Sequence, residues 1–136
     1  GIPVCCHLIV GLPGEDASHS HASLDRVLEV GVDGLKLHPL HVVKHTRLAI
    51  EWKRGEYTPL AETDYLRIAA DLIERTPWQV VYHRVTGTAA PDMLLAPAWC
   101  AKKWDVLNGI ADELARRDSR QGARAGQIWK EKSHAA

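Results

Sequence analysis

Three histidines lie close together in the sequence, and their spacing is compatible with metal chemistry. His38, His41 and His45 are separated by three and four residues, which would place imidazoles on one face of a helix, and imidazole is a common zinc ligand. Pro39, however, disfavours one helix through all three positions, and no His-Glu-x-x-His pattern accompanies them. We therefore expect structural or surface histidines and no metal ligands, with a histidine-based metallohydrolase as the weaker alternative.

A glycine-containing turn after an apolar run is the second candidate. The run up to Val10 ends in Gly11-Leu12-Pro13-Gly14, with Glu15 next and a helical pattern after it. This order places backbone N–H groups at the end of a strand, where α/β proteins bind ligands. The turn matches neither the phosphate-binding loop G-x-x-x-x-G-K-[ST] nor the dinucleotide pattern G-x-G-x-x-G. By itself it indicates either a ligand-binding turn or an ordinary strand-to-helix turn.

The cysteines do not form a metal-binding pattern. Cys5 and Cys6 are adjacent and Cys100 is distant, so the sequence contains no Cys-x-x-Cys motif. Adjacent residues of a strand point to opposite faces and are poorly placed to bind one metal ion together. We expect all three to be small buried residues in a reducing compartment. His7, in the same apolar run, is expected in the core.

The composition excludes several classes of function. Lys plus Arg and Asp plus Glu both number 17, so no net charge favours nucleic acid or an anionic membrane as a partner. No apolar run approaches the roughly 20 residues that a membrane span needs. No signal peptide is visible, although a missing N-terminus would hide one, and we expect a cytoplasmic protein. The chain begins with Gly1 almost inside a strand, and we therefore expect a fragment of a longer product.

The periodicity of apolar residues predicts alternating strands and helices. Strands are predicted over 2–10, 35–41 and 78–86, and the stretch 93–96 is predicted as a strand or a loop. Helices are predicted over 47–54, 63–75 and 99–117. A further helix, capped by Asp16 or Ser18, is predicted to end at position 30. Near-continuous apolarity in the first strand is typical of a parallel strand covered on both faces. Pro39 fits best as the last residue of its strand, since proline donates no ladder hydrogen bond.

This order of elements predicts a parallel sheet with right-handed crossovers. In such a sheet the loops Gly11–Glu15, Pro39–Thr46 and Thr86–Asp92 meet at one edge, where α/β proteins build their sites. The polar candidates in or beside these loops are Glu15, His38, His41, His45, Arg84, Thr86 and Asp92. Three or four strands are too few to close an eight-stranded barrel, so they form a small open sheet or one side of a larger barrel.

The helix predicted over 99–117 has the most regular apolar stripe. Its members are Cys100, Trp104, Leu107, Ala111 and Leu114. The basic residues beside the stripe are interpreted as a solvated edge rather than a nucleic-acid face. Positions 122–136 are small, polar and basic, which predicts a frayed tail.

Six blocks of residues, in order, resemble a known family. The run His7–Glu15 is similar to the strand-five signature of radical S-adenosylmethionine (SAM) enzymes, written D-x-I-x-G-x-P-G-[EQ]. The other blocks are Asp33–Lys44, Gly55–Leu60, His83–Gly87, Lys103–Asn108 and Arg117–Gly122. Together they resemble the C-terminal half of the YhcC-like group, with coproporphyrinogen-oxidase-like and Elp3-like character.

The resemblance implies an α/β fold that is the C-terminal portion of a partial (β/α)6 TIM-like barrel, with a C-terminal amphipathic helix. It divides the chain into barrel units over 1–92, a helical extension over 93–122 and a flexible tail over 123–136. In this family a Cys-x-x-x-Cys-x-x-Cys loop binds a [4Fe–4S] cluster, which on reduction cleaves SAM to a 5′-deoxyadenosyl radical. The expected electron donor is a protein such as flavodoxin or ferredoxin.

The same resemblance assigns roles to particular residues. The residues expected to bind the SAM cofactor, on its adenine side, are Ile9, Val10, Gly11, Leu12, Pro13 and Gly14. The residues expected to face the substrate are Glu15, His38, His41, Arg84 and Thr86. Close backbone approach at a glycine and apolar contact with a branched side chain are physically suited to an adenine.

The chain departs from the family in two respects. The family has Lys-Gly-Thr-Pro-Leu after its next strand, whereas this chain has Lys-His-Thr-Arg-Leu over 44–48. The cluster-binding cysteine motif is absent, so the cluster ligands are expected in a missing N-terminal half. A non-catalytic α/β binding or interaction module is therefore the main alternative function. No residue pattern indicates the substrate.

Overall fold

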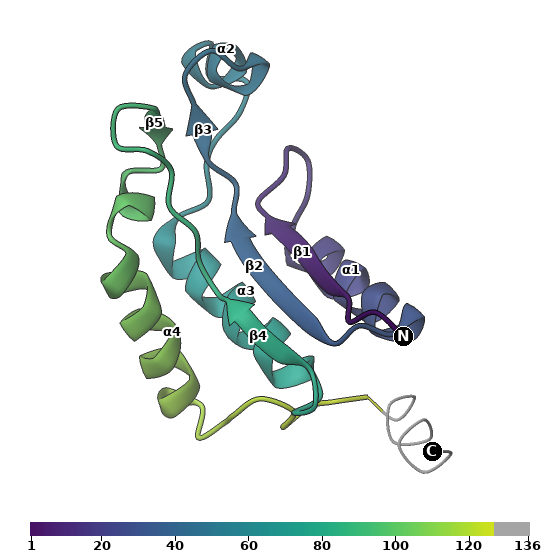
Figure 1. Ribbon diagram of the computed structural model, residues 1–136. Coiled ribbons are helices and arrows are strands. Elements are labelled where there is room, and N and C mark those ends of the chain that lie inside the picture. The colour runs from purple at the N-terminus through teal and green to yellow at the C-terminus, as the bar shows by residue number, and fades with distance from the viewer. Residues whose placement is uncertain (127–136) are drawn as a thin grey trace.

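The computed structural model describes residues 1–126, which form a sheet with helices behind it (Figure 1). In chain order the elements are β1 (Cys5–Val10), α1 (Ala17–Val30), β2 (Gly34–Pro39), β3 (Val42–Val43), α2 (Arg47–Lys53), α3 (Glu62–Arg75), β4 (Val81–Arg84), β5 (Leu94–Ala96), the 3-10 helix η1 (Ala98–Ala101) and α4 (Lys103–Arg116). The strands β1, β2 and β4 pair in parallel, with β2 in the centre. The predicted parallel arrangement is confirmed for these three strands.

Helices cover only one face of this sheet. The helices α1 and α3 lie behind the strands in Figure 1, and α4 packs beside α3. Along β1, Leu8 and Val10 are buried against the helices, whereas Ile9 between them is 47% exposed. The expectation that this strand is covered on both faces is wrong, because α1, α3 and α4 share a single core cluster on one side. We call the uncovered side of the β1–β2–β4 sheet the open face.

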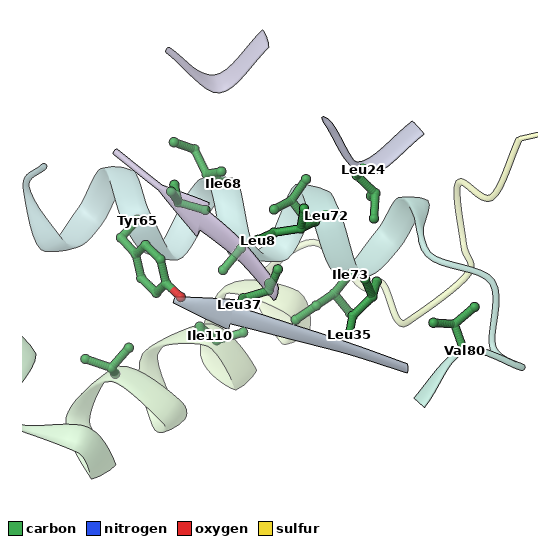
Figure 2. Close-up of a cluster of buried hydrophobic side chains, with 13 residues drawn as sticks. Leu8, Leu24, Leu35, Leu37, Tyr65, Ile68, Leu72, Ile73, Val80 and Ile110 are labelled. Atoms are coloured by element: carbon green, nitrogen blue, oxygen red, sulfur yellow. The ribbon is translucent and has the colours of Figure 1, made fainter. Parts of the chain in front are cut away.

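The core lies between the sheet and α3 (Figure 2). Leu24 of α1, Leu37 of β2 and Leu72 of α3 are fully buried in it. Tyr65 of α3 reaches the end of β4 and donates its hydroxyl to the Val85 carbonyl oxygen at 2.7 Å. Burial of a leucine side chain stabilises the fold by about 1.5–3 kcal/mol. This packing fixes the ends of the strands relative to α3.

The start of α1 follows directly from local sequence chemistry. Asp16 accepts a hydrogen bond from the Ser18 backbone N–H at 2.8 Å, and the His19 ring accepts one from the Asp16 N–H at 3.1 Å. This reciprocal pair is a capping box, which satisfies N–H groups that the first turn leaves unpaired. Of the two predicted caps, Asp16 is the one used.

Both outer strands are shorter than predicted. Before β1, the Val4 N–H donates to a carboxylate oxygen of Asp33 at 2.7 Å, so Val4 is tied to a turn. Before β4, the Val80 N–H donates to the Pro77 carbonyl oxygen at 3.1 Å and closes a turn. The central strand ends at Pro39 as expected, because proline donates no further ladder bond.

The chain also forms a second, two-stranded sheet. β3 pairs antiparallel with β5, and Val42 stands opposite Ala96. The stretch 93–96, predicted as strand or loop, is thus a strand, but it lies outside the main sheet (Figure 1). β3 was not predicted, because two residues are too few to show a period.

The predicted single helix over 99–117 is two helices. A 3-10 turn ends at Ala101, and α4 begins at Lys103. The break changes the phase of the apolar stripe, so Trp104 is 72% exposed while Val106 and Ile110 are buried. The predicted stripe is therefore wrong at Trp104 and at Ala111, which is also exposed. Packing of the buried pair against α3 is what fixes the helix.

Two burial predictions at the start of the chain are also wrong. Cys5 and His7 are exposed, Cys6 is half-buried and Cys100 is buried. The error has the same cause as for β1, because alternate side chains of this strand point to the open face.

Ion pairs attach the segment after α4 to α3. Arg117 donates to Glu74 at 3.1 Å and to Asp71 at 2.7 Å, and the Glu74 side chain is 1% exposed. The Arg124 N–H donates to the Glu74 carbonyl oxygen at 2.8 Å. Positions 127–136 of the predicted tail lie outside the described residues. Within residues 1–126, none of the helices has the length and apolarity to cross a membrane.

Candidate functional site

The carboxyl ends of the three parallel strands meet at one edge of the sheet, as predicted. The segment after β1 contacts the segment after β2, since the Leu40 N–H donates to the Val10 carbonyl oxygen at 2.9 Å. Ile9 stands opposite His38 in the parallel register. The loops that carry most of the candidate residues therefore leave the sheet side by side.

The turn after β1 requires glycine. Gly11 has φ +96°, a backbone conformation that residues with a side chain rarely adopt. A Cβ there would lie 2.7 Å from the Leu60 Cδ1, so Leu60 occupies the space that a side chain would need. The Tyr57 hydroxyl donates to the Gly11 carbonyl oxygen at 2.7 Å. Backbone geometry and contacts with Leu60 and Tyr57 thus hold the turn in one shape.

The neighbouring residues Ile9 and Val10 point to opposite faces. Ile9 is 47% exposed on the open face, whereas Val10 is 1% exposed and belongs to the core. Leu12, in the turn, is 37% exposed. Of the residues expected to bind a cofactor, Ile9 and Leu12 therefore offer apolar side chains to a ligand, and Val10 has only its backbone available.

A cavity of about 250 Å³ opens at the free edge of β1. Its lining comprises His7, Leu8, Ile9, Val10, Leu12, Glu15, Ser20, Ser23 and Leu72. β1 is an outer strand of the sheet, so the backbone groups of this edge have no strand partner among residues 1–126. Glu15 is exposed at the mouth of this cavity rather than beside the histidines.

The structure brings together His38 and His41. Their ring centroids are 5.3 Å apart with an interplanar angle of 60°, an edge-to-face arrangement. The His38 ring lies directly over the backbone of Gly87, where a Cβ would fall 1.9 Å from the His38 Cε1. The two rings and the loop after β4 form one cluster, which we call the histidine cluster. Sequence reasoning did not place Gly87 in the site, although it follows a predicted strand and ends the block His83–Gly87.

Both rings of the histidine cluster are held in the neutral form. Burial lowers the pKa of His38, and the nearby Arg84 and His7 lower it further. Burial also lowers the pKa of His41, and His38 adds to this shift. Because the unperturbed pKa is about 6.5, a lowered pKa favours the neutral form of both imidazoles at pH 7. A neutral imidazole both donates and accepts a hydrogen bond, which suits contact with a polar substrate.

Two of the predicted substrate-side residues, Thr86 and Arg84, differ in their exposure to solvent. Thr86 is 1% exposed, and its Oγ1 is buried with no hydrogen-bond partner in the described part of the chain. Arg84 is exposed and is paired in register with Lys36 of β2. Its register with Lys36 places the two residues on the same side of the sheet, and its positive charge contributes to the lowered pKa of His38. Asp92 is exposed in the following loop.

Two polar residues of the open face were not among the predicted site residues. Lys36 alternates with the fully buried Leu35 and Leu37, so it projects to the open face beside His7. His83 covers Gly34, where a Cβ would lie 2.6 Å from the His83 ring. They were missed because the sequence pattern does not show that one face of the sheet is left uncovered.

The described residues do not form a metal site. Within residues 1–126, no three His, Cys, Asp or Glu side chains are grouped so that they could hold a metal ion. His45 is exposed and has φ +64°. The metallohydrolase alternative required this residue to join His38 and His41, and nothing in the structure brings the three together.

Comparison with known proteins decides the family. The model of the Radical_SAM C-terminal domain matches residues 32–116, which is more than half of the chain. The chain belongs to the radical SAM C-terminal domain family. This radical SAM domain is 42% identical to protein YhcC of Escherichia coli (strain K12) over 129 residues, covering 95% of the chain and 41% of YhcC. It is 36% identical to YtqA of Bacillus subtilis (strain 168) over 122 residues, covering 90% of the chain and 38% of YtqA.

A solved structure has the same fold. The archaeal Methanocaldococcus infernus Elp3 with an N-terminal deletion superposes with a TM-score of 0.74 at 18% identity, covering 88% of this chain and 28% of that one. At this identity the likeness concerns the α/β fold alone. The domain spans about two-fifths of the length of the curated relatives that it matches, at 41% and 38%.

The described residues fit the adenine of SAM but do not fit the [4Fe–4S] cluster. Ile9 and Leu12 beside the Gly11 turn provide apolar surface for an adenine. A [4Fe–4S] cluster needs thiolates, and burial raises the pKa of the Cys100 thiol to about 12, which keeps it protonated. Cys5 and Cys6 point to opposite faces of β1. The described residues therefore do not fit the cluster.

Proposed function

We propose that this domain forms the later strands of a partial (β/α)6 barrel in a radical SAM enzyme, with the open face lining the interior of that barrel. The N-terminal barrel units would complete the sheet along the free edge of β1. The proposal keeps the division into barrel units over 1–92, a helical extension over 93–122 and a tail over 123–136. It is supported by the family match and by the exposure of one sheet face and one strand edge.

In this function Ile9 and Leu12 form the adenine-side wall for SAM. The observation that carries the proposal is the position of Ile9, half-exposed on the open face at the carboxyl end of β1. Gly11 places its backbone beside this wall, and the Tyr57 hydroxyl fixes the turn by occupying the Gly11 carbonyl oxygen. In the full-length enzyme, SAM would supply the radical chemistry, and its cluster would be held by the N-terminal part rather than by the described residues of this domain.

The substrate side is formed by the histidine cluster together with Arg84. The neutral rings of His38 and His41 offer hydrogen-bond donors and acceptors at pH 7. Thr86, next to the Gly87 backbone on which the His38 ring lies, has a buried hydroxyl that lacks a partner among residues 1–126. Glu15 stands at the cavity beside β1. An electron donor such as flavodoxin or ferredoxin and a cytoplasmic location complete the proposal.

The experiment uses the full-length protein that carries this domain. After anaerobic reconstitution with iron and sulfide, the reduced protein is expected to show an iron–sulfur absorption band and to release 5′-deoxyadenosine from SAM. The Ile9→Asp variant is expected to lose SAM turnover, because it places a carboxylate against the adenine. Ile50→Asp, at an isoleucine of α2 that is 52% exposed, is the matched control. Absence of turnover by the reduced, cluster-loaded wild type would favour the non-catalytic binding module instead.

A further inference from the structure

The open face carries two cationic side chains, Lys36 and Arg84, with three histidines near them. Lys36 of β2 is the register partner of Arg84 of β4, just after a bulge in that pairing, and of His7 of β1 on the other side. His38 lies two residues further along β2, and His83 lies over the start of the same strand. These five residues come from all three strands of the sheet.

The described part of the chain provides no counter-charge for this area. No Asp or Glu occurs in β1, β2 or β4. Among residues 1–126, neither Lys36 nor Arg84 makes an ion pair. Arg117, which follows α4 on the helical side of the sheet, differs from them because it forms ion pairs with three carboxylates.

Two like charges in register on neighbouring strands destabilise a sheet. Lys36 and Arg84 are in this arrangement, and Lys36 is only partly exposed between the fully buried Leu35 and Leu37. Partial burial weakens solvent screening, which makes an unpaired cation more costly and a bound anion more favourable. A cationic area on a partly desolvated surface is a general device for attracting negatively charged ligands.

We propose that Lys36 and Arg84 bind an oxyanion group of the substrate, a phosphate or a carboxylate. This inference rests on the proposed function, since it names the chemical group of the substrate that the open face would bind. Arg84 would contribute the planar guanidinium fork that matches two oxygens, and Lys36 a single strong charge. The neutral rings of the histidine cluster would bind the adjoining polar part of the substrate. His7, Lys36 and Arg84 are register partners across the sheet, and His7 precedes Ile9 by two residues. At the rise of a β-strand this separation from the proposed adenine-binding residue Ile9 is about 7 Å.

The test is calorimetric titration of the full-length protein in the absence of SAM, with pyrophosphate, succinate and methionine as separate probes. Saturable binding of pyrophosphate or succinate is expected, and whichever binds more tightly identifies the group as phosphate or carboxylate. Arg84→Met and Lys36→Met are each expected to weaken that binding about tenfold. Lys36→Arg retains the charge and is expected to retain most of the affinity. Lys53→Met, at an exposed lysine of α2, is the matched control and is expected to change nothing.

Three results would overturn the inference. One is the absence of saturable binding of pyrophosphate and succinate. Another is equal weakening by the Lys53 control, which would show only a net-charge effect. The third is preferential, Lys36-dependent binding of methionine, which would assign the oxyanion to the carboxylate of the cofactor. SAM turnover is measured on the same preparations. Because anion binding is measured without SAM, a failure of this inference can be distinguished from a failure of the proposed function, which would show as loss of SAM turnover.

Discussion

Ile9 and Val10 are neighbours in the sequence, but the structure predicts opposite consequences for their substitution. Ile9 is 47% exposed on the open face, and Val10 is 1% exposed in the core. Ile9→Ala removes three methylene-sized groups, each worth about 0.8 kcal/mol when fully buried. Because about half of this side chain is available to a ligand, loss of its adenine contact weakens SAM binding by about 1.2 kcal/mol. That free energy corresponds to about an eightfold increase in Kd.

Val10→Ala is expected to act on stability instead. Its side chain is enclosed in the core beside Leu37, so truncation leaves a void and lowers the free energy of unfolding by about 2 kcal/mol. Binding of SAM to the folded protein is expected to stay within about twofold of wild type. The measurements are SAM titration and urea unfolding of the same full-length preparations, with Ile50→Ala as a control for loss of an exposed isoleucine. A larger effect of Val10→Ala than of Ile9→Ala on the Kd for SAM would refute the assignment of faces.

Three further predictions follow from the site. The free energy of unfolding should fall as the pH drops below about 6.5. The pKa values of His38 and His41 are lowered in the folded state, so the unfolded chain binds more protons than the folded one in this range. Urea unfolding at pH 7.5, 6.5 and 5.5 measures this, and equal stability at all three values would contradict it. Gly87→Ala places a Cβ 1.9 Å from the His38 ring, so the ring must move, and its NMR resonances should shift; unchanged resonances would exclude the contact between this ring and the Gly87 backbone. Gly11→Ala should lower the free energy of unfolding by about 1–3 kcal/mol through its positive φ and its clash with Leu60, whereas thermal melting equal to wild type would show that the turn adapts.

Much of the fold can be predicted from local signals. Asp16 caps α1, and Pro39 ends β2, because each acts through its own backbone chemistry. The parallel order of the three main strands follows from the alternation of strands and helices. These features need only a few consecutive residues, and for this reason they are visible in the sequence.

The features that were missed depend on tertiary packing. An apolar strand looks the same whether one face or two are covered, so the exposure of His7 and the position of Lys36 were not visible. The phase of α4 depends on the break after Ala101, which turns Trp104 outward. Gly87 matters because His38 lies on it, a contact between segments about fifty residues apart. The candidate site was therefore predictable in its location at the strand ends, but not in its composition on the open face.

The central claim is that the adenine of SAM lies against the open face at the end of β1. The most direct measurement is photo-crosslinking of the full-length, cluster-loaded protein with an azidoadenine analogue of SAM, followed by mapping of the modified peptides by mass spectrometry. The account predicts labelling within residues 9–15, with protection by unlabelled SAM and loss of labelling in the Ile9→Asp variant. Protectable labelling confined to other segments, such as α2 or α4, would contradict it.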